Sequence, residues 1–438
     1  MSRNTFRGGI HPSGNKRTTI DKNFSTLAIP HVCYIPLQQH AGKPATPVVN
    51  VGDIVQEGQL IGRADGFISS NIHSSIPGKV IEINDYPTIY SKKTKCVVVE
   101  VKGEFTTSGK QLEKRKWDIL SKEELFDIIK NSGIAGMGGA AFPTPVKLSP
   151  PKDKIIDALI INGAECEPYL TVDDMLMRTF PEEIIEGINI TMKVLGVNKA
   201  YIGIESNKPG SISALKNIIK NKNIEIKILK TKYPQGAEKQ LIYSILKKEV
   251  PSGGLPMDAG VVVQNVGTIH AIREAVVLGK TLFERYVTVT GKCINKPGNY
   301  KIKIGTKISD IVEECGGLNE EPAKIIMGGP MCGIAINSLD IPVVKGTSGI
   351  LFLSRADVKV EKYNKCIRCG RCVSICPSGI LPCDISTAME KNRLDLLENL
   401  HVFDCIMCGA CSYICPSRRP LSHFIKQAQD KLRKKKSA

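Results

Sequence analysis

The sequence is poor in aromatic side chains and has no long apolar segment. Only one of its 438 residues is Trp, and aromatic residues make up 5% of the chain. No apolar run approaches the ~20 residues that a membrane-spanning helix needs. Residues 1–9 lack the apolar core of a secretory signal peptide. This predicts a chain that is made and kept in the cytosol, where thiols stay reduced.

Acidic residues are scarce relative to basic ones. The chain has 43 Asp and Glu against 60 Lys and Arg, which gives a formal net charge of +17. Such a balance predicts an anionic partner. The sequence shows no module that combines aromatic and basic residues, so an acidic protein or the anionic inner membrane surface fits better than a nucleic acid. The basic run at 431–436 is either a solvated tail or a contact to such a surface.

Cysteine, by contrast, is abundant and patterned. Eight of the fifteen cysteines form two copies of C-x2-C-x2-C-x3-C-P, at 366–377 and 405–416. This pattern holds [4Fe–4S] clusters in two-cluster ferredoxins, where the fourth cysteine of each run serves the other cluster. The predicted ligand sets therefore cross: Cys366, Cys369, Cys372 and Cys415 for one cluster, and Cys405, Cys408, Cys411 and Cys376 for the second.

A pair of zinc sites is the alternative for these cysteines, because four thiolates also suit zinc. Structural zinc sites usually use separated C-x2-C pairs, so the pattern favours clusters, which carry electrons one at a time. The seven other cysteines are scattered, and we expect them to be core or incidental thiols. They are Cys33, Cys96, Cys166, Cys293, Cys315, Cys332 and Cys383.

Length and composition suggest three or four domains, each with its own core, since 42% of the residues are hydrophobic. We predict an α/β multidomain protein. Its parts would be a barrel-sandwich domain at 1–115, an α/β domain at 116–282, a β-grasp domain at 283–356, and a helical two-cluster ferredoxin-like domain with a basic tail at 357–438.

The N-terminal prediction comes from residues 44–83, which alternate short β runs with Gly and Asp turns. This stretch resembles the barrel-sandwich fold of biotinyl and lipoyl carrier domains. Those carriers present a modified lysine on a tight hairpin, whereas the equivalent stretch here, at 63–68, has no lysine. We therefore expect a structural or docking module without a swinging arm.

The second domain begins with a capping box, Ser121 followed by Glu124, which predicts a helix from Lys122. Beyond it, apolar runs alternate with helical patterns, which predicts a mostly parallel sheet covered by helices. The expected strands are at 158–161, 200–204, 224–229 and 260–263, and the expected helices at 181–195, 209–221 and 236–249. Strands at 285–291 and 298–304 and a helix at 308–315 suggest the β-grasp domain, and a helical linker at 384–400 joins the cysteine runs.

A glycine-rich loop, Gly136-Met-Gly-Gly-Ala-Ala-Phe-Pro-Thr-Pro-Val-Lys147, precedes the first of these strands. On its own, such a loop is either a structural turn or a place where the backbone approaches a phosphate or a ring. Three further motifs follow in order: Asn162-Gly-Ala-Glu-Cys-Glu-Pro168, Tyr233-Pro-Gln-Gly-Ala-Glu238 and Gln264-Asn-Val-Gly-Thr268. All four resemble motifs of the flavin- and NADH-binding subunit family of respiratory complex I. The resemblance implies a complex-I-type flavin-binding fold for this domain.

The resemblance also implies roles for the matched positions. FMN and its phosphate would lie against Gly136, Gly138, Gly139 and Lys147. The flavin ring or ribityl chain would contact Asn162, Asn265 and Thr268, with Gly236 as a further cofactor-binding position. The nicotinamide nucleotide would meet Phe142, Glu165, Glu167 and Glu238, of which Phe142 and Glu238 are the catalytic candidates. Aromatic rings stack on rings, lysine binds phosphate, and carboxylates accept from ribose hydroxyls.

This sequence departs from the complex I pattern at four places: Met137 replaces Arg, Ala164 replaces Asp, Ala237 replaces Glu, and Gln264 replaces Asn. The first two changes remove polar groups near the expected nucleotide. The departures weaken the expectation for nucleotide affinity more than the expectation for the flavin.

Two crossed cysteine motifs at the end, and Phe6-Arg-Gly-Gly-Ile-His-Pro12 near the start, resemble the RnfC family. RnfC is the peripheral subunit of the Rnf ion-pumping complexes. That resemblance implies an enzyme subunit with FMN and two [4Fe–4S] clusters, exchanging electrons between NAD(H) and ferredoxin while the complex transports Na⁺ or H⁺. It implies other membrane subunits and a ferredoxin-like iron–sulfur subunit as partners, and a peripheral place on the cytoplasmic face of the membrane.

Two alternatives stay open. The chain is a docking scaffold that carries clusters but no active flavin, or it is a free-standing NADH-dependent reductase of a corrinoid. Bound flavin in the purified protein separates the first alternative from the main interpretation. Co-purification with membranes argues against the second.

Overall fold

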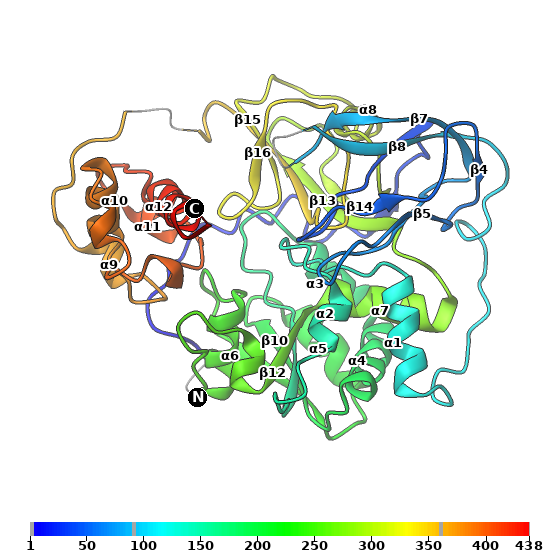
Figure 1. Ribbon diagram of the computed structural model, residues 1–438, viewed down its shortest axis with the longest axis horizontal. Helices are drawn as coiled ribbons and strands as arrows, with labels where there is room; N and C mark the ends of the chain where they lie inside the picture. The colour runs from blue at the N-terminus through cyan, green and yellow to red at the C-terminus, as the bar shows by residue number, and fades with distance from the viewer. Residues whose placement is uncertain (1–3, 90–92, 359–361, 438) are drawn as a thin grey trace.

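The computed structural model describes residues 4–89, 93–358 and 362–437. It confirms the predicted fold class: two β domains lie beside an α/β domain, and a small helical lobe is attached at one side (Figure 1). No helix among the described residues is long and apolar enough to cross a membrane. The start of the chain at residues 1–3 lies outside the described residues.

The barrel-sandwich domain consists of two antiparallel sheets, ordered β2-β8-β7-β4 and β3-β5-β6. Their inward side chains, such as Ile35, Ile61 and Val97, are fully buried. The hairpin between β5 and β6 contains the stretch without lysine, and its Phe67 is 77% exposed. The strands are β2 (Val32–Pro36), β3 (Thr46–Pro47), β4 (Ile54–Val55), β5 (Leu60–Arg63), β6 (Ile72–His73), β7 (Gly78–Pro87) and β8 (Lys93–Val101).

Residues 4–26 leave this domain and run along the others. Strand β1 (Phe24–Thr26) pairs in parallel with β14 of the β-grasp domain. Further upstream, backbone bridges join Asn4 to Leu229 and Ile10 to Tyr233 in the α/β domain. We call residues 4–23 the N-terminal strap. The domain boundaries stay predictions, and the strap is a part of the 1–115 region that packs elsewhere.

The α/β domain has a four-stranded parallel sheet in the order β11-β10-β9-β12, with helices on both faces. Ser121 and Glu124 form the predicted capping box, with Ser121 Oγ accepting from the Glu124 N–H at 3.2 Å. The elements are α1 (Lys122–Asn131), α2 (Thr144–Leu148), β9 (Ala158–Asn162), α3 (Val172–Thr179), α4 (Pro181–Leu195), β10 (Ala200–Glu205), α5 (Pro209–Ile218), β11 (Ile224–Leu229), α6 (Glu238–Leu246), a 3₁₀ turn (Pro256–Ala259), β12 (Val261–Asn265) and α7 (Val266–Leu278).

The β-grasp domain is a sheet ordered β1-β14-β13-β17-β15-β16, with one helix packed against it. Strand β13 is antiparallel to β14 and parallel to β17, the mixed pairing that a β-grasp fold has. The elements are β13 (Glu284–Gly291), β14 (Gly298–Lys303), α8 (Ile308–Glu314), β15 (Lys324–Met327), β16 (Ile334–Ile336) and β17 (Gly349–Leu353).

The helical lobe at the left of Figure 1 contains both cysteine runs. The helical linker predicted at 384–400 is helical over only part of its length: its helix ends at Glu390, because Asn392 adopts φ +52°, which a helix cannot contain. The basic run forms the end of the last helix. The elements are α9 (Arg371–Ser374), α10 (Pro382–Glu390), 3₁₀ turns at Leu394–Leu396 and Val402–Asp404, α11 (Ala410–Ile414) and α12 (Leu421–Ser437).

A buried ion pair fastens the barrel sandwich to the β-grasp domain. Lys303 Nζ on β14 lies 2.7 Å from Glu57 Oε1 and 3.0 Å from Glu284 Oε2. The side chains of Glu57 and Lys303 are 0% and 8% exposed. Removing one partner from such a pair leaves an uncompensated buried charge.

We expect Glu57→Ala to lower the midpoint of thermal unfolding, followed by circular dichroism, because breaking a buried pair costs about 3–5 kcal/mol. The matched control is Asp65→Ala, which breaks the exposed Lys43–Asp65 pair on the same domain and should change the midpoint little. Equal effects of the two substitutions would contradict a structural role for the buried pair.

Candidate functional site

The carboxyl end of the parallel sheet has a topological switch point. From β9 the chain runs to β10 and β11 on one side, and it returns to β12 on the other. Ligands of open α/β sheets bind at such points, outside the carboxyl ends of the strands. Asn162 ends β9 and Asn265 ends β12, and the two residues are register partners. The two asparagines assigned to the flavin are therefore neighbours at the edge where a ligand is expected.

The glycine-rich loop covers this edge. A Cβ on Gly138 would lie 3.5 Å from the Asn265 Cβ, so the loop backbone passes close above that residue. The Gly136 N–H donates to the Phe142 carbonyl at 2.8 Å, which closes the loop on itself. Gly138 and Gly139 are exposed. Their backbone is thus open to a ligand, as the resemblance implies.

Thr268 lies buried in the first turn of α7. Its side chain is fully buried, and its Oγ1 accepts a hydrogen bond from the Met137 N–H at 2.9 Å. Asn265 is the N-cap of α7, with Oδ1 accepting from Gly267 at 2.8 Å. Thr268 therefore anchors the glycine loop to α7, and its contact with a flavin stays a prediction.

Lys147 and Glu238 meet at the side of the site. The Lys147 Nζ on α2 pairs with the Glu238 carboxylate at the start of α6, and it also donates to the Val263 carbonyl at 3.2 Å. Glu238 keeps 41% of its side chain exposed. The residue expected to bind the FMN phosphate and one catalytic candidate are therefore adjacent. A bound phosphate would share Lys147 with Glu238. Phe142, the second candidate, is half-buried.

Gly236 lies against the first asparagine. Its carbonyl accepts from Asn162 Nδ2 at 2.8 Å, and its N–H donates to the Cys166 Sγ at 3.2 Å. A side chain at Gly236 would lie 3.3 Å from that sulfur and 3.5 Å from Asn162 Oδ1. The motif at 233–238 is thus held against the loop that follows β9.

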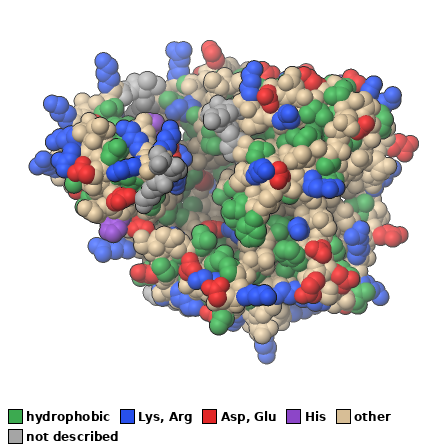
Figure 2. Space-filling model, in the orientation of Figure 1, with side chains coloured by type: hydrophobic (Ala, Val, Ile, Leu, Met, Phe, Trp, Pro, Cys, Tyr) green, Lys and Arg blue, Asp and Glu red, His purple; other side chains and the backbone are tan. Residues whose placement is uncertain are grey.

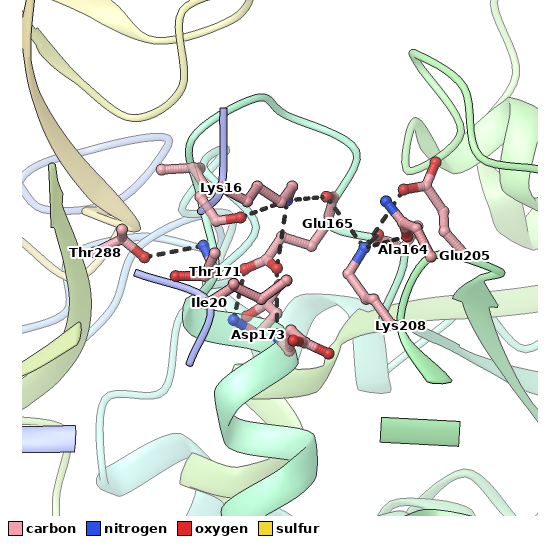
Figure 3. Close-up of polar contacts among 12 residues, drawn as sticks. Lys16, Ile20, Ala164, Glu165, Thr171, Asp173, Glu205, Lys208 and Thr288 are labelled. Atoms are coloured by element: carbon pink, nitrogen blue, oxygen red, sulfur yellow. Dashed lines mark hydrogen bonds and ion pairs between the residues drawn. The ribbon is translucent and has the colours of Figure 1, made fainter. Parts of the chain in front are cut away.

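Glu165 points into the protein, and its assignment to the nucleotide stays a prediction. Its side chain is 3% exposed, and it accepts from the N–H groups of Asp173 at 2.7 Å and Asp174 at 3.4 Å, at the start of α3. Lys16 of the strap lies 3.6 Å away (Figure 3). Burial raises the pKa of Glu165 to about 7, and Lys16 opposes that rise.

Glu167 is turned inward as well. Its two oxygens accept from the Met331 N–H at 3.0 Å and the Cys332 N–H at 2.8 Å, in the turn between β15 and β16. Burial raises the pKa of this carboxyl, and the two backbone donors oppose the rise. Both carboxylates hold the 162–170 loop in place, and their contact with a nucleotide stays a prediction.

The sequence offered no local signal for the cations that hold this loop. Lys208 Nζ donates to the Ala164 carbonyl at 2.5 Å and pairs with Glu205 at 3.4 Å (Figure 3). Lys16 Nζ donates to the carbonyls of Glu165, at 2.9 Å, and Leu170. Both lysines are mostly buried. They neutralise carbonyls and carboxylates that the loop turns inward.

A further buried contact involves Asn265, one of the two asparagines expected at the flavin. Asp173 at the start of α3 accepts from Asn265 Nδ2 at 2.7 Å. Burial raises the pKa of Asp173, and Asn265 and the nearby Arg285 oppose the rise. Arg285 also donates to the carbonyls of Thr347, at 3.0 Å, and Met137, at 3.5 Å. The orientation of the Asn265 amide is therefore set from within the protein.

The eight motif cysteines surround two cavities in the crossed arrangement that their spacing predicts. One cavity is lined by the outer set, and the other by the inner set. The outer set is Cys366, Cys369, Cys372 and Cys415. The inner set is Cys376, Cys405, Cys408 and Cys411. Cys383 also lines the outer cavity. Four motif thiols around each hollow suit a [4Fe–4S] cluster, and as ligands they remain our assignment.

The inner set lies against the α/β domain. The Tyr233 hydroxyl donates to the Cys408 carbonyl at 2.8 Å and lies 2.9 Å from the Cys332 Sγ. Ile10 of the strap, Tyr233 and Cys408 share one buried apolar cluster. The strap adds a second tie, because the Gly9 N–H donates to the Ile375 carbonyl at 2.8 Å. The sequence showed the Tyr233 motif but not this contact to the second cysteine run.

Comparison with known families assigns each region. Residues 4–104 match the RnfC barrel sandwich hybrid domain, and residues 129–274 match the Nuo51 FMN-binding domain. Residues 286–335 match the SLBB domain, and residues 359–416 match the 4Fe-4S dicluster domain.

The fold is shared with a solved NAD⁺-reducing [NiFe]-hydrogenase in its H2-reduced state. The similarity has a TM-score of 0.50 at 18% identity, and it covers 71% of this chain and 63% of that chain, less than two thirds of its length. At this identity the similarity shows the fold alone.

Curated relatives match over most of their length. The chain is 47% identical to the C subunit of the proton-translocating ferredoxin:NAD⁺ oxidoreductase complex of Clostridium ljungdahlii, over 89% of this chain and 85% of that protein. It is 44% identical to the C subunit of the Na⁺-translocating ferredoxin:NAD⁺ oxidoreductase complex of Acetobacterium woodii, over 97% and 96%. The chain belongs to the RnfC family, the C subunits of ion-translocating ferredoxin:NAD⁺ oxidoreductase complexes.

Proposed function

We propose that this chain exchanges a hydride between NAD(H) and FMN and passes single electrons through two [4Fe–4S] clusters to the rest of an Rnf complex. The complex would couple ferredoxin:NAD⁺ oxidoreduction to transport of Na⁺ or H⁺. The observation that carries the proposal is the turn at 233–236. One end holds Asn162 at the flavin edge through Gly236, and the other bonds Cys408 of the inner set through Tyr233.

The residues at the sheet edge fit an FMN. Exposed glycines at 138 and 139 offer backbone N–H groups, Asn162 and Asn265 offer amides, and Lys147 offers a positive charge. A flavin is the group that accepts a hydride and releases single electrons, so it supplies the step between NAD(H) and the clusters. Glu238 and Phe142 stay our proposals for the nicotinamide side, because both are partly exposed beside Lys147.

The two cluster positions define an order. The inner set is in contact with the α/β domain through Tyr233 and the strap. The outer set is turned away from that contact, and its Cys369 is exposed. We therefore place the inner cluster next to the flavin and the outer cluster next to the partner.

The surface around the outer set fits an acidic partner. Exposed basic residues lie in the segments that carry the outer set, and Figure 2 shows Lys and Arg gathered over the lobe formed by this domain. They are Lys362, Lys365, Arg368, Arg371 and Arg418. We propose that a ferredoxin-like iron–sulfur subunit docks here, with the chain peripheral to the membrane on its cytoplasmic face, beside the membrane subunits.

The proposal predicts a fixed order of reduction. When the purified chain, with clusters reconstituted anaerobically and FMN added, is titrated with NADH, the flavin band should bleach first. Cluster absorbance should fall afterwards or with a stronger reductant. Clusters without bound flavin and without response to NADH would instead support a docking scaffold.

Lys147→Ala should weaken FMN binding about 10-fold or more, because a charge-assisted hydrogen bond contributes about 1.5–3 kcal/mol. Fluorescence titration with FMN measures the dissociation constant. Lys152→Ala is the matched control, since Lys152 is exposed and its loss changes the net charge equally. An unchanged constant in Lys147→Ala would remove the phosphate role.

Cys411→Ala and Cys372→Ala test the order of the clusters and control for each other. Without the inner cluster, NADH should reduce the flavin while the outer cluster stays oxidised in the first seconds. Without the outer cluster, NADH should still reduce the inner one. Rapid-freeze electron paramagnetic resonance (EPR) distinguishes these results, and normal reduction of the outer cluster in Cys411→Ala would reverse the assignment.

A further inference from the structure

The cluster domain repeats itself in structure as well as in sequence. Cys366 and Cys405 begin copies that match at a constant offset along the chain. Equivalent residues adopt equivalent backbones: φ is 55° at Arg368 and 56° at Met407, and 72° at both Gly370 and Gly409. The two halves therefore form a pseudo-symmetric pair, and any chemical difference between the cavities comes from residues that break the symmetry.

Among the buried residues of the two cavity walls, one pair of equivalent residues differs strongly in polarity. Arg419, four residues after Cys415, lines the outer cavity. Ile380, four residues after Cys376, lines the inner cavity at the matching place. The outer cavity thus has a cationic hydrogen-bond donor in its wall where the inner cavity has an alkyl group.

Arg419 is buried, and one of its donors has no acceptor within the described part of the chain. The residue is 3% exposed, and its terminal nitrogen donates to Ser386 Oγ at 3.0 Å and Glu390 Oε2 at 2.6 Å on α10. Its Nε is buried and has no hydrogen-bond partner among the described residues. A buried donor left unsatisfied is costly, so this Nε–H is available to an acceptor held in the cavity that Arg419 lines.

The cluster of the outer set supplies such acceptors, because its sulfurs accept hydrogen bonds. We propose that Arg419 donates its Nε–H to a sulfur of the outer cluster and holds the reduction potential of that cluster above that of the inner one. The inference rests on the two clusters of the proposed function. It adds to that function the residue that makes the two clusters unequal.

The direction in which Arg419 would shift the reduction potential follows from charge. A cluster that is reduced takes up one electron and no other atom, so it gains one negative charge. An N–H donor and a guanidinium both stabilise that charge, and hydrogen bonds and net charge are terms that set cluster potentials. Glu390 offsets part of the positive charge of Arg419 but leaves the Nε–H available to donate. The Ile380 side chain has neither a positive charge nor an N–H to donate.

The consequence of this difference in potential is that the outer cluster would hold the electron between transfers. Because an electron favours the site of higher potential, the outer cluster would be the more reduced of the two at equilibrium, whichever way the current runs. Arg419 is a positioning and tuning residue in this account, and it contacts no substrate.

The first test uses the unmodified chain. Full-length protein with both clusters reconstituted is titrated with dithionite and redox mediators under anaerobic conditions, and the clusters are followed by EPR. Cys411→Ala, which lacks the inner cluster, identifies the outer signal. We expect two midpoint potentials, with the higher one at the outer cluster. Equal potentials, or the higher one at the inner cluster, would overturn the proposal.

The second test changes Arg419. Arg419→Ile, which copies the inner cavity, should shift only the outer midpoint downward, and the inner cluster in the same sample is the internal reference. Arg418→Gln is the matched control: it removes one charge from the same segment, is exposed and does not line the cavity. It should move neither midpoint.

Arg419→Lys is a second variant, used in case Arg419→Ile does not assemble the outer cluster. It keeps the charge and loses the Nε–H, so the outer midpoint should also fall, by less. Iron and sulfide analysis of each variant checks that both clusters are assembled. Absence of clusters from the unmodified chain would sink the proposed function, whereas assembled clusters with unmoved midpoints in both Arg419 variants would sink only this inference.

Discussion

The hydrogen bond from the Tyr233 hydroxyl to the Cys408 carbonyl is the contact on which the arrangement of the redox sites depends. It joins the turn that supports Asn162 at the flavin edge to the backbone of the inner cysteine set. The bond lies in a buried apolar cluster that excludes water, so both groups would lose a hydrogen bond without replacement if they separated. Four parts of the chain meet there: the strap, the α/β domain, the β-grasp turn and the cluster domain.

Buried charges keep the loop beside this junction in its shape. Lys16 and Lys208 bring two ammonium groups to carbonyls that no strand or helix satisfies, and Glu165 caps the start of α3 from the same loop. Groups of this kind are costly to bury unless each has partners. Their mutual satisfaction stabilises the loop that follows Asn162, whose register partner on the neighbouring strand is Asn265.

The cluster domain shows how the two halves of a duplicated sequence come to have different surroundings. Its halves share backbone angles and cysteine positions, so a perfect repeat would give two equal sites. Contact with Tyr233 distinguishes the inner set, and Arg419 distinguishes the outer one. An electron carrier built from two like units needs such differences, because identical surroundings give identical potentials.

The sequence by itself determined the fold class, the four kinds of domain and the crossed cysteine sets. These features rest on short-range patterns: cysteine spacing, the capping box at Ser121, and alternating apolar runs that the parallel sheet reproduces. The helical linker predicted at 384–400 is interrupted at Asn392, where a positive φ ends the helix. The flavin residues came from resemblance, and resemblance placed Glu165, Glu167 and Thr268 toward ligands.

Only the tertiary structure decided where those three side chains point, and why. Lys16 is 149 residues from Glu165, and Met331 is 164 residues from Glu167, so no local pattern records either contact. The same holds for the contact of Tyr233 with Cys408, and for the Arg419 Nε that the described residues leave without an acceptor. Burial and partner choice are set by which surfaces meet when the domains pack, and a motif read along the chain does not contain that information.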